Sequence, residues 1–192
     1  MPSTWGAEII LSPVTIRRAD PERDAVACAA IYAPQVEASA TSFEAEAPTA
    51  EEMAARIERL GATHQWLVAE RDEEVEGFAY ACEHRSRAAY RWAVDVSVYV
   101  DESARGRGLG RMLYEELFER LRAQRFRVAC AGITLPNEAS VALHEGLGFT
   151  PVGVYRRIGW KQGAWQDVGW WQLDLDPDAA DPPEEPRPPG YH

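Results

Sequence analysis

The sequence has few cysteines and no long apolar run, and each shortage excludes a class of protein. Its 3 cysteines, Cys28, Cys82 and Cys130, are odd in number and too scattered for a disulfide framework. No CxxC or paired Cys/His spacing indicates zinc, so we expect buried thiols and no bound metal. No apolar stretch approaches the ~18 residues of a membrane span, and no basic segment followed by an apolar core marks a signal peptide. These absences predict a cytoplasmic protein that does not bind membranes.

Positive charge is also scarce. The chain of 192 residues carries 31 acidic against 20 basic side chains, a net charge of −11. A general nucleic-acid or anionic-membrane binder needs a basic surface, so neither partner is expected. The hydrophobic content of 46% excludes wholesale disorder, and the length fits one domain.

Proline and acid are concentrated at the C-terminal end. Residues 176–192 hold six of the thirteen prolines and five acids against one arginine. Such a segment buries too little apolar surface to offset its ordering entropy, which predicts an extended or disordered tail. The chain therefore divides into an N-terminal extension (1–12), one folded domain (13–175) and this tail (176–192).

Hydrophobic periodicity within the domain alternates between strand and helix. The predicted strands are 14–16, 65–70, 75–82, 92–100, 127–134, 151–158 and 167–175. The predicted helices are 21–36, 50–61, 108–121 and 138–146, the second of them ending at Gly61. In the clearest strand, 92–100, four valines share one face while Asp95, Ser97 and Tyr99 share the other. This order predicts an α/β domain (α+β type), with a central mixed sheet flanked by helices.

A glycine-rich loop joins the strand 92–100 to the next helix. Glycines let a backbone approach a ligand closely, and the N–H groups at a helix start bind anions. Arg105 and Arg107 add positive charge to the loop of an acidic protein. The loop lacks the GxxxxGK pattern of nucleoside triphosphatases. It also lacks GxGxxG, because the third glycine would fall on Arg111. The loop therefore predicts a different phosphate-bearing ligand.

The spacing Arg105-x-x-Gly108-x-Gly110 resembles the pyrophosphate loop of the GNAT N-acetyltransferase superfamily. Segments 89–92, 97–100, 135–137, 144–149 and 165–173 resemble, more narrowly, its phosphinothricin N-acetyltransferase branch. The resemblance implies a GNAT fold that binds acetyl-CoA in a V-shaped opening between the fourth and fifth strands. The residues it assigns to acetyl-CoA are Val98, Tyr99, Val100, Arg105, Gly106, Arg107, Gly108, Leu109, Gly110, Arg111, Asn137 and Ser140.

Two residues are candidates for the chemistry of acetyl transfer. The acceptor amine must be neutral to attack, so a base is useful, and burial would raise the pKa of Asp95 on its valine-rich strand. The family usually has Glu at this position, so the shorter Asp95 would act directly or through a water. His144, two helical turns after Asn137, would polarise the thioester or protonate the leaving thiolate. Its position is one that many relatives fill with tyrosine.

The acceptor is expected to be a small anionic amino acid. Arg85, Arg87 and Tyr90 cluster in one loop, and arginine binds carboxylate and phosphinate oxygens in a bidentate manner. The resemblance adds Phe43 and Val168 as pocket walls, and it implies a homodimer. The predicted reaction is direct transfer in a ternary complex to an amino acid of the phosphinothricin or methionine sulfoximine type. Two alternatives stay open: another acceptor, such as a polyamine or a protein N-terminus, and a non-catalytic acyl-CoA-binding module.

Overall fold

Seven strands form one mixed sheet in the computed structural model, which describes residues 12–190. The strands are β1 (Thr15–Arg18), β2 (Gln65–Arg71), β3 (Glu74–Glu83), β4 (Ala93–Val100), β5 (Val128–Leu135), β6 (Thr150–Lys161) and β7 (Ala164–Asp174). Their order in the sheet is β1-β2-β3-β4-β5-β7-β6, and β4–β5 is the parallel pair. The mixed sheet and the order of elements predicted from sequence are confirmed. The expected N-terminal extension, apart from Ser12, lies outside the described residues.

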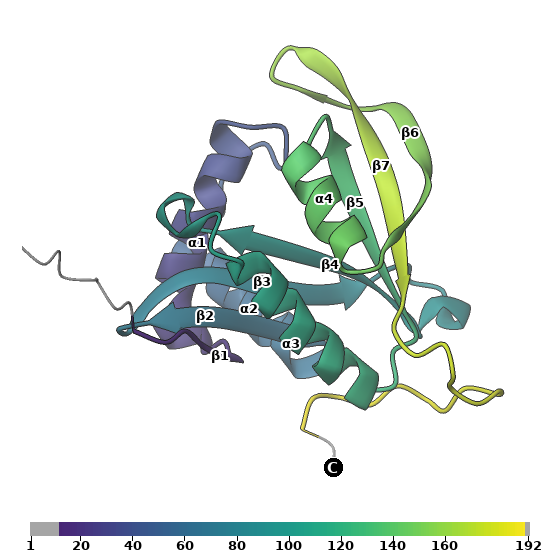
Figure 1. Cartoon of the computed structure of the whole chain (residues 1–192). Helices are drawn as coiled ribbons and strands as arrows, with labels where there is room; N and C mark the ends of the chain where they lie inside the picture. The colour runs from purple at the N-terminus through teal and green to yellow at the C-terminus, as the bar shows by residue number, and fades with distance from the viewer. Residues whose placement is uncertain (1–11, 191–192) are drawn as a thin grey trace, which may run out of the picture.

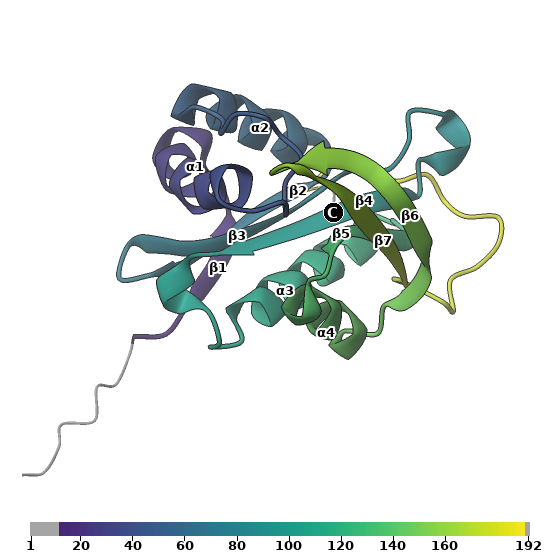
Figure 2. The same ribbon diagram turned by 90° about the horizontal axis from the view of Figure 1, so that it is seen from above.

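Two pairs of helices cover opposite faces of the sheet (Figure 1). In the view from above, α1 (Pro21–Glu37) and α2 (Ala50–Thr63) lie on one side, and α3 (Leu109–Ala123) and α4 (Glu138–Gly146) on the other (Figure 2). Each side has its own apolar core: Phe78 of β3 packs in the core of the first pair, and Leu113 of α3 packs in the core of the second. Within residues 12–190, no helix combines the length and the apolar character that crossing a membrane would need.

The helix starts follow the capping chemistry of the sequence. The Asp20 side chain accepts from the N–H groups of Glu22 and Arg23 and so caps α1. Thr49 and Glu52 form a reciprocal capping box at the start of α2. The predicted end of α2 at Gly61 is wrong, since the helix continues to Thr63. Gly61 is not among the residues with positive φ, so it does not form the left-handed turn with which glycine ends a helix.

The two faces of β4 serve the two layers, as the alternation predicted. Val94 and Val96 are buried in the core beneath α3, whereas Tyr99 packs into the core of α1 and α2. Asp95 shares the face of Tyr99, opposite Cys82 on β3. The register of the sheet thus fixes which layer Asp95 faces.

The pairing of β4 with β5 stops halfway along the two strands. The paired positions run from Ala93–Val128 to Asp95–Cys130, and no residue of β4 after Asp95 is paired with β5. The strands diverge after this point, while β5 continues along β7 to Leu135 (Figure 1). The backbone of Val96–Val100 on its β5 side is therefore available to a ligand. Asp95 lies where the opening begins.

The described part of the acidic tail, residues 176–190, has no helix or strand and runs along the domain. The Glu185 carboxylate accepts two hydrogen bonds of 2.6 Å from Arg91, and the Trp92 indole N–H donates to the Glu184 carbonyl at 2.8 Å. The Arg127 guanidinium donates to the Ala180 carbonyl at 2.9 Å. The tail thus contacts the loop between β3 and β4, which also carries the predicted acceptor residues.

Candidate active site

The loop between β4 and α3 has the geometry of an anion site. Gly106 and Gly108 adopt positive φ values of 75° and 78°, which favour glycine. The first N–H groups of α3 have no partner within the helix, and the first turn of α3 holds no acidic side chain. This helix start therefore offers N–H groups and the positive end of the helix dipole to a phosphate.

A cleft of about 660 Å³, here called the donor cleft, runs from this loop into the opening between β4 and β5. Eleven of the twelve residues predicted to bind acetyl-CoA line it: Val98, Tyr99, Val100, Arg105, Gly106, Gly108, Leu109, Gly110, Arg111, Asn137 and Ser140. Arg107 is the predicted residue that does not. Its guanidinium is exposed, 4.0 Å from the Glu76 carboxylate. The structure thus brings together two segments, 98–111 and 137–140, that lie far apart in sequence.

The inner end of the donor cleft is a cavity of about 70 Å³ beside Ser97, Tyr114 and His144. His144 is buried, and its Nδ1–H donates to the Ser140 carbonyl at 2.7 Å. Its Nε2 therefore accepts from the Tyr114 hydroxyl, 3.1 Å away. Burial lowers the pKa of His144 and raises that of Tyr114, so the pair is neutral at neutral pH.

A third cavity, here called the acceptor cavity, has a volume of about 350 Å³. It lies against β6 and β7, and Arg85 and Trp170 contribute to its lining. The Arg85 guanidinium lies 5.9 Å from the centre of the Trp170 ring. Trp170 also packs over Gly132, where an added Cβ would lie 3.3 Å from the indole. Because Gly132 lines the inner end of the donor cleft, the cavities are neighbours across this contact.

Asp95 accepts a hydrogen bond from a histidine that lines the acceptor cavity. His84, directly after β3, donates from Nδ1 to the Asp95 carboxylate at 2.6 Å. This leaves Nε2 of the neutral ring as an acceptor. Burial raises the pKa of Asp95, and the hydrogen bond from His84 opposes that rise. His84 and Cys130 line the acceptor cavity, whereas Asp95 is not among the described residues that line it.

The residues predicted to bind the acceptor are only partly brought together. Arg85 lines the acceptor cavity, whereas Arg87 is exposed at the start of a short 3₁₀ helix (Ala88–Tyr90). The Tyr90 ring lies 5.9 Å from that of His84. Phe43 packs against Gly159 of β6, and Val168 of β7 lies between its neighbours on β5 and β6.

Sequence reasoning missed His84 and Trp170. His84 has no partner pattern in the sequence, because its partner is eleven residues away across a hairpin. The signal was the antiparallel register: Cys82 opposes Asp95, and His84 lies two residues further on the same strand path.

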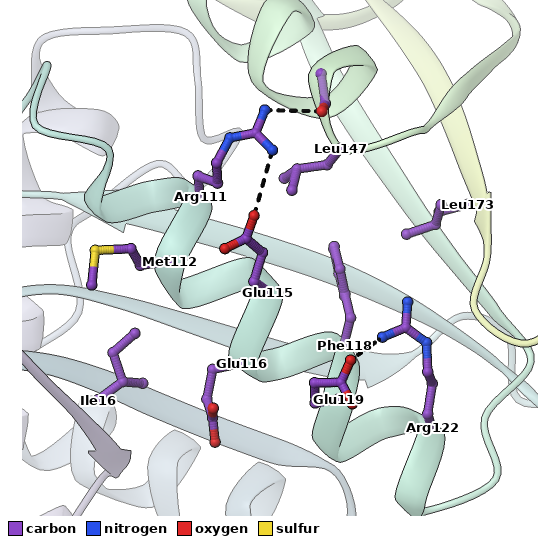
Figure 3. Close-up of a pocket in the computed structure, with 11 residues that line it drawn as sticks. Ile16, Arg111, Met112, Glu115, Glu116, Phe118, Glu119, Arg122, Leu147 and Leu173 are labelled. Atoms are coloured by element: carbon purple, nitrogen blue, oxygen red, sulfur yellow. Dashed lines mark hydrogen bonds and ion pairs between the residues drawn. The ribbon is translucent and has the colours of Figure 1, made fainter.

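A groove of about 590 Å³ on the outer side of α3 is a different feature (Figure 3). Its charged residues are already paired along the helix. Arg111 lies 3.5 Å from Glu115, and Arg122 lies 2.8 Å from Glu119. Arg111 is shared with the donor cleft and also donates to the Gly146 carbonyl at 2.9 Å. These internal ion pairs leave the groove without the convergent polar groups of an active site.

The comparisons with known proteins agree with this geometry. The family described as an acetyltransferase (GNAT) domain matches residues 16–170. The chain belongs to the GNAT acetyltransferase family. The donor cleft of this GNAT acetyltransferase lies within the matched region.

Relatives of this GNAT acetyltransferase align over lengths that range from just over half to nearly all of the chain. It is 42% identical to a phosphinothricin N-acetyltransferase of Streptomyces viridochromogenes over 92% of this chain and 94% of that one. It is 42% identical to an L-methionine sulfoximine/L-methionine sulfone acetyltransferase of Pseudomonas aeruginosa over 57% of this chain and 63% of that one. A solved structure of a GNAT phosphinothricin acetyltransferase from Sinorhizobium meliloti, in complex with AcCoA, aligns with a TM-score of 0.83 and 35% identity. This alignment covers 89% of this chain and 94% of that one. The protein is thus an N-acetyltransferase close to these enzymes.

Proposed function

We propose that this acetyltransferase transfers the acetyl group of acetyl-CoA to the α-amino group of a small anionic amino acid. The observation that supports this most directly is that the donor cleft and the acceptor cavity are neighbours, because Trp170 of the acceptor cavity packs over Gly132 at the inner end of the donor cleft. The inner end of the donor cleft reaches Ser97 and Val98 on β4, and the acceptor cavity begins at His84 and Cys130. Relatives that act on phosphinothricin and methionine sulfoximine support this acceptor type.

The donor cleft fits acetyl-CoA in charge and backbone geometry. The N–H groups from Gly106 to Arg111 would hold the pyrophosphate, and the unpaired edge of β4 would bond the pantetheine amides. At Gly108 a Cβ would contact nothing in the protein, so the space beside this backbone is open to a ligand. When bound, acetyl-CoA supplies the thioester that the amine attacks.

The His84–Asp95 pair would deprotonate the incoming amine. An α-amino group with a pKa near ~8 is mostly protonated at neutral pH and must lose a proton to attack. Asp95 fixes His84 through Nδ1, so Nε2 is the atom that would accept this proton on the cavity side. His84 thereby extends the short Asp95 side chain towards the acceptor, and Asp95 stabilises the imidazolium that forms.

Arg85 would hold the anionic end of the acceptor. Its guanidinium lies at the acceptor cavity, beside the Trp170 ring that would form an apolar wall. Phe43 and Val168 would position these walls through β6 and β7, and Arg87 and Tyr90 would order the loop that carries Arg85. A polyamine would instead require acidic side chains at this place.

At the inner end of the donor cleft, Tyr114 and His144 would act through their hydrogen bonds within the protein. The Tyr114 hydroxyl lines the inner cavity and is fixed by His144 Nε2. Both groups are neutral, and both of their protons are already donated, to His144 Nε2 and to the Ser140 carbonyl. We therefore assign them the positioning of α4 against the inner cavity, rather than polarisation of the thioester or protonation of the thiolate.

Direct transfer needs no acetyl-enzyme. Cys130 lies beside Asp95, but burial and the Asp95 charge raise its pKa to about 11. The thiol is therefore protonated at neutral pH and is a poor nucleophile.

The test is release of CoA thiol from acetyl-CoA in the presence of separate acceptors. The panel contains phosphinothricin, methionine sulfoximine, methionine sulfone, spermidine and a peptide with a free N-terminus. The proposal predicts fast release with the first three and little with the others. Preference for spermidine or the peptide would establish the alternative acceptors. A thermal shift with CoA but no release with any amine would establish the non-catalytic module.

The exposed edge of β6 supports the expected homodimer. Six large apolar side chains on the β6–β7 hairpin are solvent-exposed in the monomer: Val152, Val154, Tyr155, Ile158, Trp160 and Trp165. Patches of this kind typically mark protein interfaces. Val154 and Tyr155 also line the acceptor cavity, so a second copy of the chain packed here would narrow the opening of this cavity.

A further inference from the structure

Three potential metal ligands converge beside the acceptor cavity. One ring nitrogen of His84, one carboxylate oxygen of Asp95 and the Cys130 sulfur all lie within 4.8 Å of one another. Their positions are fixed by the sheet, because Asp95 is paired with Cys82 on β3 and with Cys130 on β5. No zinc spacing is present in the sequence, because these ligands come from three neighbouring strand ends rather than from one segment.

Nitrogen, oxygen and sulfur together form a donor set for a borderline-soft divalent ion. Zinc binds such ligands at about 2.0–2.3 Å, so ligand atoms in a tetrahedral site stand roughly 3.3–3.8 Å apart. The His84 Nδ1 and the Asp95 oxygen are now 2.6 Å apart, so binding one ion through these two atoms would require them to separate by roughly 0.7 Å, which small side-chain rotations supply. Hard ions such as Mg²⁺ and Ca²⁺ prefer all-oxygen sites and would not be favoured here.

The site is reachable from solvent. His84 and Cys130 both line the acceptor cavity, so an ion can enter there and keep its fourth position for water. Arg85, in the adjoining loop, places a positive charge near Asp95 and Cys130. The positive charge of Arg85 repels a bound cation and lowers its affinity, which favours reversible binding over permanent retention.

We propose that a zinc-type divalent ion binds His84, Asp95 and Cys130 and inhibits the acetyltransferase. The Cys130 thiol loses its proton to solvent as the sulfur–metal bond forms, and His84 binds as the neutral ring. Asp95 exchanges its hydrogen bond from His84 for the metal. No group is oxidised or reduced. The inhibition rests on the proposed function, in which His84 and Asp95 deprotonate the acceptor amine. Binding of the ion does not depend on that function.

Binding is tested first, without acetyl-CoA. Co²⁺ replaces zinc and gives a near-ultraviolet charge-transfer band when a thiolate is a ligand. We expect this band in the full-length wild type and in Cys82→Ser, whose thiol faces Asp95 but lies outside the three ligands. We expect its loss in Cys130→Ser. Absence of the band in the wild type, or its persistence in Cys130→Ser, would overturn the proposal.

Inhibition is tested on the same variants by following loss of thioester absorbance, because zinc also binds the released CoA thiol. Each variant is compared with its own rate without zinc, and Cys130→Ser should need about tenfold or more zinc than the wild type for half inhibition. EDTA should restore the wild-type rate, and Mg²⁺ should have no effect. Equal inhibition of wild type and Cys130→Ser, or no inhibition of a wild type that shows the cobalt band, would refute the inhibitory role. If no acceptor is acetylated, the cobalt band still decides whether the ion binds.

Discussion

The donor cleft and the acceptor cavity are built in different ways. The donor cleft is mainly backbone: two left-handed glycines, a helix start and a strand edge without a partner, most of it from the continuous stretch 98–111. The acceptor cavity is made of side chains from the β3–β4 loop, β5, β6 and β7. Backbone geometry suits a ligand shared by a whole superfamily, whereas side chains from scattered segments allow the acceptor to differ between members.

Removing the charge of Asp95 should have the largest effect and should leave the donor side intact. Asp95→Asn should lower kcat by ~10² to 10⁴, the range for loss of a positioned base system. The dissociation constant for acetyl-CoA, measured by calorimetry, should change less than about twofold. An unchanged kcat would remove Asp95 from the mechanism.

The same variant should not lose stability at neutral pH. Burial raises the pKa of Asp95 above its unfolded value, so its contribution to folding is favourable at low pH and is lost as the pH rises through the folded pKa. Asn is neutral throughout and can still accept from His84. The Tm of Asp95→Asn at pH 7 should therefore equal or exceed that of the wild type. A lower Tm would show that the carboxylate stabilises the fold.

Charge reversal at two arginines of one loop should distinguish direct binding of the acceptor from a general effect of surface charge. Arg85→Glu should raise the KM for an anionic acceptor by ~10- to 100-fold, because a charge-assisted hydrogen bond is replaced by repulsion. Arg87→Glu makes the same charge change at an exposed position outside the acceptor cavity and should have a smaller effect. Equal KM changes would mean that the loop acts only through its overall charge.

Substitution of two glycines with similar positive φ values should have different effects on the affinity for CoA. Gly108 in the loop and Gly163 in the β6–β7 turn have φ values of 78° and 74°, and a Cβ at either would contact nothing in the protein. Alanine at each should cost about 1 kcal/mol of stability. Gly108→Ala should also weaken CoA binding about tenfold, because the Cβ enters the space for the pyrophosphate, whereas Gly163→Ala should not. Calorimetric titration with CoA compares them, and equal affinities would place the pyrophosphate elsewhere.

The smallest effect is expected at the tail. Glu185 pairs with Arg91 at an exposed position, where ion pairs contribute little. Glu185→Ala should change the acceptor KM by less than about twofold and leave the KM for acetyl-CoA unaltered. A large rise in the acceptor KM would show that the tail orders the loop carrying Arg85.

The same contrast explains what the sequence could predict. Glycine spacing and strand alternation are local, so the loop before Gly108 and the two faces of β4 could be predicted, as could the capping of α1 by Asp20. The pairing of His84 with Asp95 could not, because it depends on the register across a hairpin. The predicted end of α2 at Gly61 is wrong for a related reason. Glycine permits a helix end but does not impose one, and α2 continues to Thr63. Arg107 illustrates a third limit, since charge in a loop does not fix the direction of a long side chain.

We propose that donor and acceptor bind at the same time, in the neighbouring donor cleft and acceptor cavity. Initial velocities measured while acetyl-CoA and phosphinothricin are both varied test it most directly. The account predicts reciprocal plots that intersect, the pattern of a ternary complex, and no acetylated enzyme after incubation with acetyl-CoA alone. Parallel lines together with an acetyl group on the protein, for instance on Cys130, would contradict it.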